Sequence, residues 1–149
     1  MTTGTVLAFD FGLQRIGVAV GELSHSIAHP LAAIAFADNA RRMDAIAALV
    51  NEWRPIRFVV GMPSTDGTDV HPLRAPIDRF VRRLRARFGI ETETIDESLS
   101  SWDASRTLSR SGVRARDQKQ KLDSMAACAI LTTWFEEHRP GATLPTANE

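Results

Sequence analysis

The sequence lacks the marks of several large classes of protein. Its single cysteine, Cys128, excludes an internal disulfide and a cysteine-based zinc site, and its apolar surroundings predict a core residue and not a nucleophile. No apolar run approaches the ~20 residues of a membrane span. No basic residue precedes the first apolar stretch, as one would in a secretory signal. Nucleotide-binding motifs of the GxxxxGK(S/T) or GxGxxG type do not occur. We therefore expect a cytoplasmic protein without a membrane partner.

What is present suits one globular domain. The chain has 149 residues, of which 44% are apolar, and that share is too high for a disordered protein. This length predicts a single domain, which we place at residues 1–139. Residues 140–149 are rich in proline, glycine and small polar residues and are predicted to form a flexible tail.

The net charge is zero, but positive charge is concentrated between Arg74 and Lys121. That stretch holds 12 basic and 7 acidic residues, and arginine supplies 16 of the 18 basic residues of the chain. Arginine forks match the geometry of phosphate groups, which favours a nucleic-acid partner. Solvated helix faces in a protein from a genome that prefers arginine codons would give the same pattern. Charge alone leaves both interpretations open.

Hydrophobic periodicity predicts alternating strands and helices. Short apolar and β-branched runs predict strands at 5–11, 15–22, 26–33, 57–63 and 91–96. Apolar residues three and four positions apart predict helices at 39–53, 73–88, 101–110 and about 118–138, the first capped by Asp38 and the second ended by Gly89. Residues 12–14 join the first two strands in a predicted hairpin. This order predicts an α/β fold, a mixed sheet with helices on both faces.

Three carboxylates stand where packing alone does not favour them. Asp10 ends an apolar strand, where a buried polar group without a partner costs about 2–7 kcal/mol. Glu97 follows a strand at its carboxyl end, where α/β proteins place ligands, and its neighbour Asp96 points to the opposite face. Asp123 opens a long apolar helix segment and shares a helix face with three apolar residues, Ala127, Ile130 and Trp134.

Each of these acids also has an ordinary structural interpretation. Asp10 suits a turn before Gly12. Asp123 can pair with Lys119 one helical turn earlier, and Glu97 suits the first turn of a helix. Three clustered carboxylates, however, repel one another unless a cation neutralises them. Their hard oxygen atoms favour Mg²⁺ or Mn²⁺ as a cofactor, and two such ions can support phosphodiester cleavage.

Four segments carry motifs in a fixed order: AFDFGLQRIGVAVGE, FVVGMP with the later DGT, RFVRRLRARFGIETETIDESLSSWDA, and KLDSMAACAILTTWF. The first resembles the opening Asp-x-Gly-x-x-x-Ile-Gly-Val-Ala of the YqgF (RuvX-type) family of Holliday junction resolvases and pre-16S rRNA nucleases. The second resembles that family's Val-Val-Gly-Leu-Pro strand and Asp-Gly-Thr loop. The third resembles its helix, strand and Asp-Glu-Arg-Leu-Ser-Thr segment, and the fourth its closing Asp-x-x-Ala-Ala helix. The resemblance covers about residues 5–137.

This resemblance implies a ribonuclease H-like fold, similar to that of the RuvC resolvases. It also implies that the family's catalytic and metal-binding acids fall on Asp10, Glu97 and Asp123, the same three that their positions single out. One departure stands out, because the family usually has arginine where this chain has Ser98, and Ser101 replaces the threonine that follows. Substrate handling is therefore expected to differ if that arginine binds phosphate.

Basic residues elsewhere can take over the binding of phosphates. The predicted nucleic-acid-binding residues are Arg15, Arg82, Arg85, Arg114, Arg116, Lys119 and Lys121. Arg15 begins the second predicted strand, directly after the hairpin turn, and the others lie in or beside predicted helices.

Three functions remain open at this stage. The first is a metal-dependent endonuclease that acts on structured RNA and processes the 5′ end of precursor 16S rRNA, with ribosomal precursor particles as partners. The second is a Holliday junction resolvase with the same metal chemistry and branched DNA as substrate. The third is a nucleic-acid-binding regulator that kept the fold and lost activity, which the serine at position 98 favours and the three acids oppose. The sequence leaves the oligomeric state undecided.

Overall fold

The computed structural model describes residues 4–35, 38–63, 71–96 and 115–138, and in 115–123 only the backbone. The described elements are β1 (Thr5–Phe11), β2 (Ile16–Glu22), β3 (Ala28–Ile34), α1 (Asn39–Trp53), β4 (Pro55–Met62), α2 (Arg74–Phe88), β5 (Glu91–Asp96) and α4 (Ala115–His138). No helix in these ranges is long and apolar enough to cross a membrane.

The five strands form one mixed sheet in the order β3-β2-β1-β4-β5. Strands β1 and β2 form the predicted antiparallel hairpin, and β3 adds to its outer edge. On the other side, β4 is parallel to β1 and β5 is parallel to β4. The predicted mixed α/β sheet is therefore confirmed.

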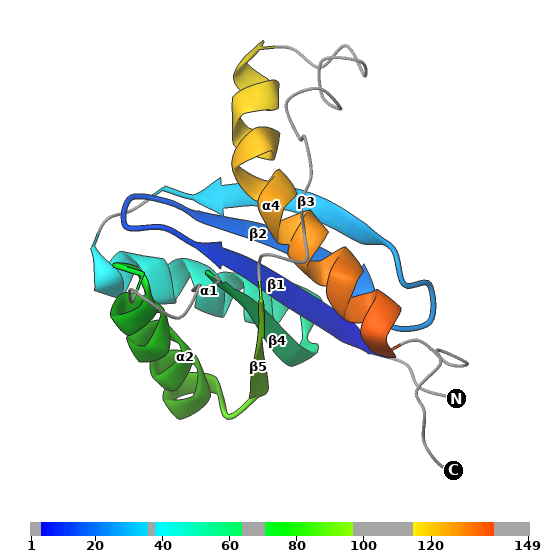
Figure 1. Ribbon diagram of the computed structural model, residues 1–149, viewed down its shortest axis with the longest axis horizontal. Helices are drawn as coiled ribbons and strands as arrows, with labels where there is room; N and C mark the ends of the chain where they lie inside the picture. Colours follow the sequence, from blue (N-terminus) through cyan, green and yellow to red (C-terminus); the bar gives the residue numbers. More distant parts are fainter. Residues whose placement is uncertain (1–3, 36–37, 64–70, 97–114, 139–149) are drawn as a thin grey trace.

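Helices cover both faces of this sheet (Figure 1). Helices α1 and α2 pack on one face, where Phe9, Phe58 and Phe80 belong to a single buried cluster. The long helix α4 packs on the other face, against smaller strand residues such as Ala8 and Ala19. Successive side chains of β1 belong to one cluster and then the other, because neighbouring side chains of a strand point to opposite faces of the sheet.

The predicted element boundaries differ from the observed ones by a few residues. Strand β3 begins two residues later than predicted and β4 two residues earlier. Helix α4 begins at Ala115 and not near Gln118, so Asp117 lies inside the helix and not in a preceding loop. The predicted helix at 101–110 lies outside the described residues.

The two predicted helix ends are confirmed by their hydrogen bonds. The Asp38 side chain accepts a bond from the backbone N–H of Arg41 at 3.0 Å, as an N-cap residue does. Gly89 adopts a left-handed conformation with φ of 64° and donates its N–H to the carbonyl of Arg85. Each signal acts through neighbouring residues, so local sequence was enough to predict it.

The chain continues toward opposite sides of the sheet after the two central strands, β1 and β4. The chain leaves β1 toward β2 on one side of the sheet, and it leaves β4 through α2 toward β5 on the other. The carboxyl ends of two such strands border the crevice where open α/β sheets bind their ligands. Asp10 lies at this edge of the sheet.

Candidate active site

Asp10 is the second-last residue of β1 and is half-buried. It follows Val6 and Ala8 at every second position, so it lies on the face of the sheet that α4 covers. Its partner across the hairpin is Gly17, which brings no side chain to the same face. The ladder from β1 to β4 ends one residue earlier, at Phe9 and Val60. Asp10 therefore lies where the two parallel strands cease to pair.

The acid predicted to follow β5 lies just beyond the described residues. Strand β5 ends at Asp96, which is exposed and pairs in register with Met62. The residue before it, Ile95, is buried in the cluster under α4, so alternation places Asp96 on the face opposite to Ile95. Glu97 is the next residue of the sequence and falls outside the described ranges.

The third predicted acid, Asp123, lies in α4, but its side chain is outside the described part. The apolar face predicted to accompany it is confirmed as buried, through Ala127, Ile130 and Trp134. Ser124, the next residue, is fully buried and fixes this part of the helix to the sheet. Its hydroxyl accepts a bond from the Val18 N–H at 3.1 Å and donates one to the Leu31 carbonyl at 2.5 Å.

Ser124 was not among the predicted site residues. It inserts where the register between β2 and β3 shifts, between Ile16 and Val18, and so satisfies backbone groups at an irregular point of the ladder. Its only signal in the sequence is that it follows Asp123 at the start of an apolar segment.

The described residues contain no group of three side chains placed to hold a metal ion. Of the predicted trio, Asp10 is the one whose side chain is described. A set of carboxylate oxygens from Asp10, Glu97 and Asp123 has the hard donor chemistry that suits Mg²⁺ or Mn²⁺. The half-buried Asp10 carboxylate at the end of β1 suits such a set of ligand oxygens.

The predicted phosphate-binding arginines differ in their surroundings. Arg15 is exposed in the turn between β1 and β2, and Arg82 is exposed on α2. Arg85 is exposed too, but its Nη2 donates to the Thr92 carbonyl at 2.7 Å and so ties α2 to β5. Within the described ranges the Arg82 side chain makes no hydrogen bond or ion pair. Arg114 is outside these ranges, and only the backbone is described for Arg116, Lys119 and Lys121.

Two further arginines of α2 act as links between helices. The Arg87 guanidinium pairs with Asp44 of α1 at 3.2 Å, and Arg83 donates to the Asn39 side chain at 3.4 Å. Part of the arginine excess in the sequence therefore stabilises the layer formed by α1 and α2. Neither of the two interpretations that charge left open included such contacts between helices.

On the edge strand β5, Glu93 is surrounded by structural partners; it pairs in register with Val59 of β4, which pairs with Ala8 of β1. It forms an ion pair with Arg57 of β4 and accepts a bond from the Trp134 indole Nε1 at 3.2 Å. The ring of His138 stacks on Trp134 with 4.1 Å between centroids. These contacts join the end of α4 to β4 and β5, so Glu93 has the role of a structural acid.

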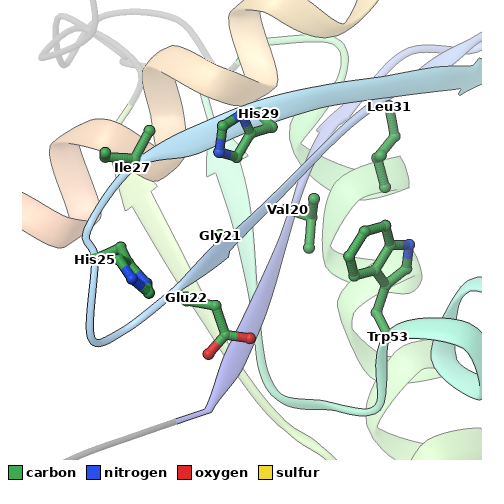
Figure 2. A pocket seen from close by; sticks show the side chains of 8 residues that line it. All are labelled: Val20, Gly21, Glu22, His25, Ile27, His29, Leu31 and Trp53. Atoms are coloured by element: carbon green, nitrogen blue, oxygen red, sulfur yellow. The ribbon is translucent and has the colours of Figure 1, made fainter.

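A hollow of about 410 Å³ lies beside the hairpin of β2 and β3 (Figure 2). It is lined by Val20, Glu22, His25, Leu31 and Trp53, among others, and its wall is mostly apolar. Glu22 pairs in register with Thr5, at the amino end of β1. The hollow therefore lies at the end of β1 away from Asp10 and contains none of the predicted site residues.

Cys128 is buried in the cluster under α4, as predicted. Burial raises the pKa of its thiol from 9.0 to about 12. The thiol therefore stays protonated near neutral pH, which removes it as a nucleophile.

Comparison with known proteins gives a consistent family and fold. Residues 4–137 match the family model of RuvX, described as a Holliday junction resolvase. The chain is 48% identical over 133 residues to a protein of Methylobacillus flagellatus, covering 89% of this chain and 91% of the relative. It is 47% identical over 135 residues to one of Nitrosospira multiformis, covering 90% and 89%. Both relatives carry the name "putative pre-16S rRNA nuclease".

Solved structures resemble this chain in fold. RuvC of Thermus thermophilus matches with a TM-score of 0.52 and 13% identity, over 88% of this chain and 93% of that one. The fowlpox virus Holliday junction resolvase matches with a TM-score of 0.54 and 10% identity, over 90% and 99%. The predicted ribonuclease H-like fold is confirmed by these similarities.

Proposed function

This chain belongs to the RuvX family, and from that membership we propose that it is a metal-dependent endonuclease that hydrolyses phosphodiester bonds of structured RNA. Its proposed substrate is precursor 16S rRNA, because the relatives at 47–48% identity are named for that substrate. Action at the 5′ end of this RNA, with ribosomal precursor particles as partners, is part of the proposal. The position of Asp10 carries the proposal: a half-buried carboxylate at the end of β1, where pairing with β4 has stopped.

The proposed metal ligands are Asp10, Glu97 and Asp123. Bound Mg²⁺ or Mn²⁺ supplies activation of a water molecule and stabilisation of the leaving oxygen. The proposed role of the Asp10 carboxylate is to offer oxygen ligands from a fixed strand end. Support for Asp123 comes from its place in α4, directly before the buried Ser124 and four residues before the buried Ala127.

The proposed phosphate contacts come from arginines and lysines around this edge and on α2. Arg15, in the turn that follows Asp10, and Arg82, exposed on α2, are described as accessible side chains. Arg114, Arg116, Lys119 and Lys121 complete the proposed set. Arg85 ranks behind Arg82, because its guanidinium is engaged with Thr92.

A second candidate is a Holliday junction resolvase that acts on branched DNA. It is favoured by the description of the matching family and by the fold shared with RuvC. A nucleic-acid-binding protein without activity is the third candidate, and Ser98 in place of the family's arginine is the observation that favours it.

One set of cleavage assays separates the three candidates. Purified protein is incubated with Mg²⁺ or Mn²⁺ and either a precursor 16S rRNA fragment or a four-way DNA junction, with Asp10→Asn as the matched control. Cleavage of RNA that Asp10→Asn abolishes supports the proposal. Cleavage of the junction alone identifies a resolvase, and binding without cleavage of either substrate identifies the inactive protein.

A further inference from the structure

The strand end that carries Asp10 is paired on one side only. Strand β1 pairs with β2 through Phe11, opposite Ile16, but its pairing with β4 stops at Phe9. The last two residues of β1 therefore lack the second neighbouring strand that holds the rest of it. A carboxylate that must meet a metal ion needs its backbone fixed to about 0.5 Å, so other contacts must hold this end.

Helix α1 supplies such a contact from the opposite face of the sheet. Arg42, in its first turn, is buried with 5% exposure, and its Nη2 donates to the Gly12 carbonyl oxygen at 2.7 Å. The guanidinium carbon also lies 5.2 Å from the centre of the Phe11 ring. Arg42 thus contacts both residues that directly follow Asp10. Figure 1 shows α1 beneath this end of the hairpin.

Both partners of this contact are themselves fixed. A Cβ atom at Gly12 would lie 2.6 Å from the Arg15 carbonyl oxygen, so the turn requires glycine at that position. The helix end is set by Asp38, whose carbonyl accepts the Arg42 backbone N–H at 3.1 Å. Arg42 therefore joins a capped helix to a turn that requires glycine at position 12.

Burial of this arginine costs free energy that a surface position would not. Desolvation lowers the pKa of its guanidinium, which reflects that cost. An aliphatic residue could fill the space between α1 and Phe11, but it could not donate a hydrogen bond to Gly12. Arginine provides both a planar cation that packs on the Phe11 ring and a hydrogen-bond donor for the Gly12 carbonyl.

We propose that Arg42 is a positioning residue for the active site, holding the turn after Asp10 so that the Asp10 carboxylate keeps its place as a metal ligand. This inference rests on the proposed function. Arg42 lies on the face of α1, whereas Asp10 lies on the face of α4, so Arg42 acts through the backbone of residues 10–12. A displacement of about 1 Å at a reacting group can lower a rate about 100-fold.

Arg87 offers a control in the same helical layer. It too lies on a helix of the α1–α2 layer, stacks over a phenylalanine at 5.5 Å and binds an oxygen atom, that of Asp44, at 3.2 Å. It is near the carboxyl end of α2, away from Asp10. Loss of Arg87 removes a cation–ring contact and an ion pair between exposed side chains without touching the turn.

The test compares Arg42→Met, Arg42→Lys and Arg87→Met in three measurements on the full chain: Mn²⁺ affinity by titration calorimetry without substrate, cleavage kinetics in Mg²⁺, and thermal unfolding. We expect Arg42→Met to weaken Mn²⁺ binding and to lower kcat about 10-fold or more at a temperature where it is fully folded. Arg42→Lys keeps a donor for Gly12 and should recover part of both. Arg87→Met should change the melting temperature alone.

Two results would overturn the inference, and they are distinguishable. If Arg42→Met lowers the melting temperature while Mn²⁺ affinity and kcat stay at wild-type values, Arg42 is a structural residue only. If Asp10→Asn binds Mn²⁺ as the wild type does, the proposed metal site is wrong and the positioning role fails with it. Arg42→Lys keeps the test valid should Arg42→Met fail to fold.

Discussion

Glu93 and Asp10 are carboxylates on the same face of one sheet, and their surroundings differ in kind. Glu93 lies within β5 and has a cation, an indole N–H and an imidazole ring assembled around it from β4 and α4. Asp10 lies at the end of β1, opposite a glycine, where one of the two neighbouring strands has stopped pairing. Glu93 is held by packed elements and is structural, whereas Asp10 lies beside the crevice in which open α/β sheets bind their ligands, which is why we propose it as a site residue.

The largest difference between the two acids is expected in activity. Asp10→Asn should lower RNA cleavage at least about 1,000-fold, since several kcal/mol of transition-state stabilisation depend on metal ligation. Its melting temperature without metal should stay near that of the wild type, because in the proposed site the change removes one charge from a cluster of carboxylates. Gel-based cleavage in Mg²⁺ and circular dichroism measure the two quantities. Glu93→Gln should retain wild-type activity per folded molecule, and equal loss in both variants would contradict the comparison.

The partners of Glu93 should matter for stability instead. Trp134 is 3% exposed, packs on β-strand residues and donates to Glu93. Trp134→Ala should lower the free energy of unfolding by about 3–5 kcal/mol, as large-to-small changes in cores do. Trp134→Phe keeps most of the buried area and should cost less. Urea denaturation followed by circular dichroism gives these values. If Trp134→Ala costs less than about 1 kcal/mol, as a surface substitution does, the carboxyl end of α4 is loosely packed on the sheet.

Local sequence was sufficient for the described elements and for the place of Asp10 at a strand end, but not for the contacts that hold this strand end and α4. Caps, glycine ends and the hairpin depend on neighbouring residues, and Asp10 could be singled out because it ends an apolar strand. The bonds of Ser124 to Val18, of Trp134 to Glu93 and of Arg42 to Gly12 join residues 106, 41 and 30 positions apart. No periodicity reports such pairs, so the roles of Ser124, Glu93 and Arg42 required the fold.

Ser124, which joins α4 to β2 and β3, is expected to have a smaller effect on stability than Trp134. Ser124→Ala leaves the Val18 N–H and the Leu31 carbonyl buried without this partner, which should cost about 1–3 kcal/mol of stability. Chemical denaturation measures the loss. Ser26→Ala is the control, since its hydroxyl makes one long bond of 3.4 Å near the surface, and its effect should be within about 0.5 kcal/mol. Equal effects would show that Ser124 does not fix α4 to the sheet.

Two arginines of α2 allow the same comparison between a proposed binding residue, Arg82, and a structural residue, Arg85. Arg82→Gln should reduce the slope of log K against log salt for RNA binding by about 0.7–0.9 with no loss of stability, because each phosphate contact releases counterions. Arg85→Gln should lower stability slightly through loss of its bond to Thr92 and change the slope less. Fluorescence anisotropy at several salt concentrations gives the slopes. An unchanged slope in Arg82→Gln would make Arg82 a solvated surface residue.

The smallest effect at neutral pH concerns Cys128, a buried ionisable group in α4 on the same face as Asp10. Burial raises the pKa of its thiol from 9.0 to about 12, so at pH 8 the folded protein holds about 1,000-fold less thiolate than the unfolded chain. Iodoacetamide should therefore modify Cys128 slowly in buffer and rapidly in urea. Below pH 9 both states keep the proton and the shift leaves stability unchanged with pH. Between pH 9 and 12 the unfolded state loses its proton first, so stability should fall across that range. Cys128→Ala should remove this part of the pH dependence, and rapid modification of the folded protein at pH 8 would contradict the burial of the thiol.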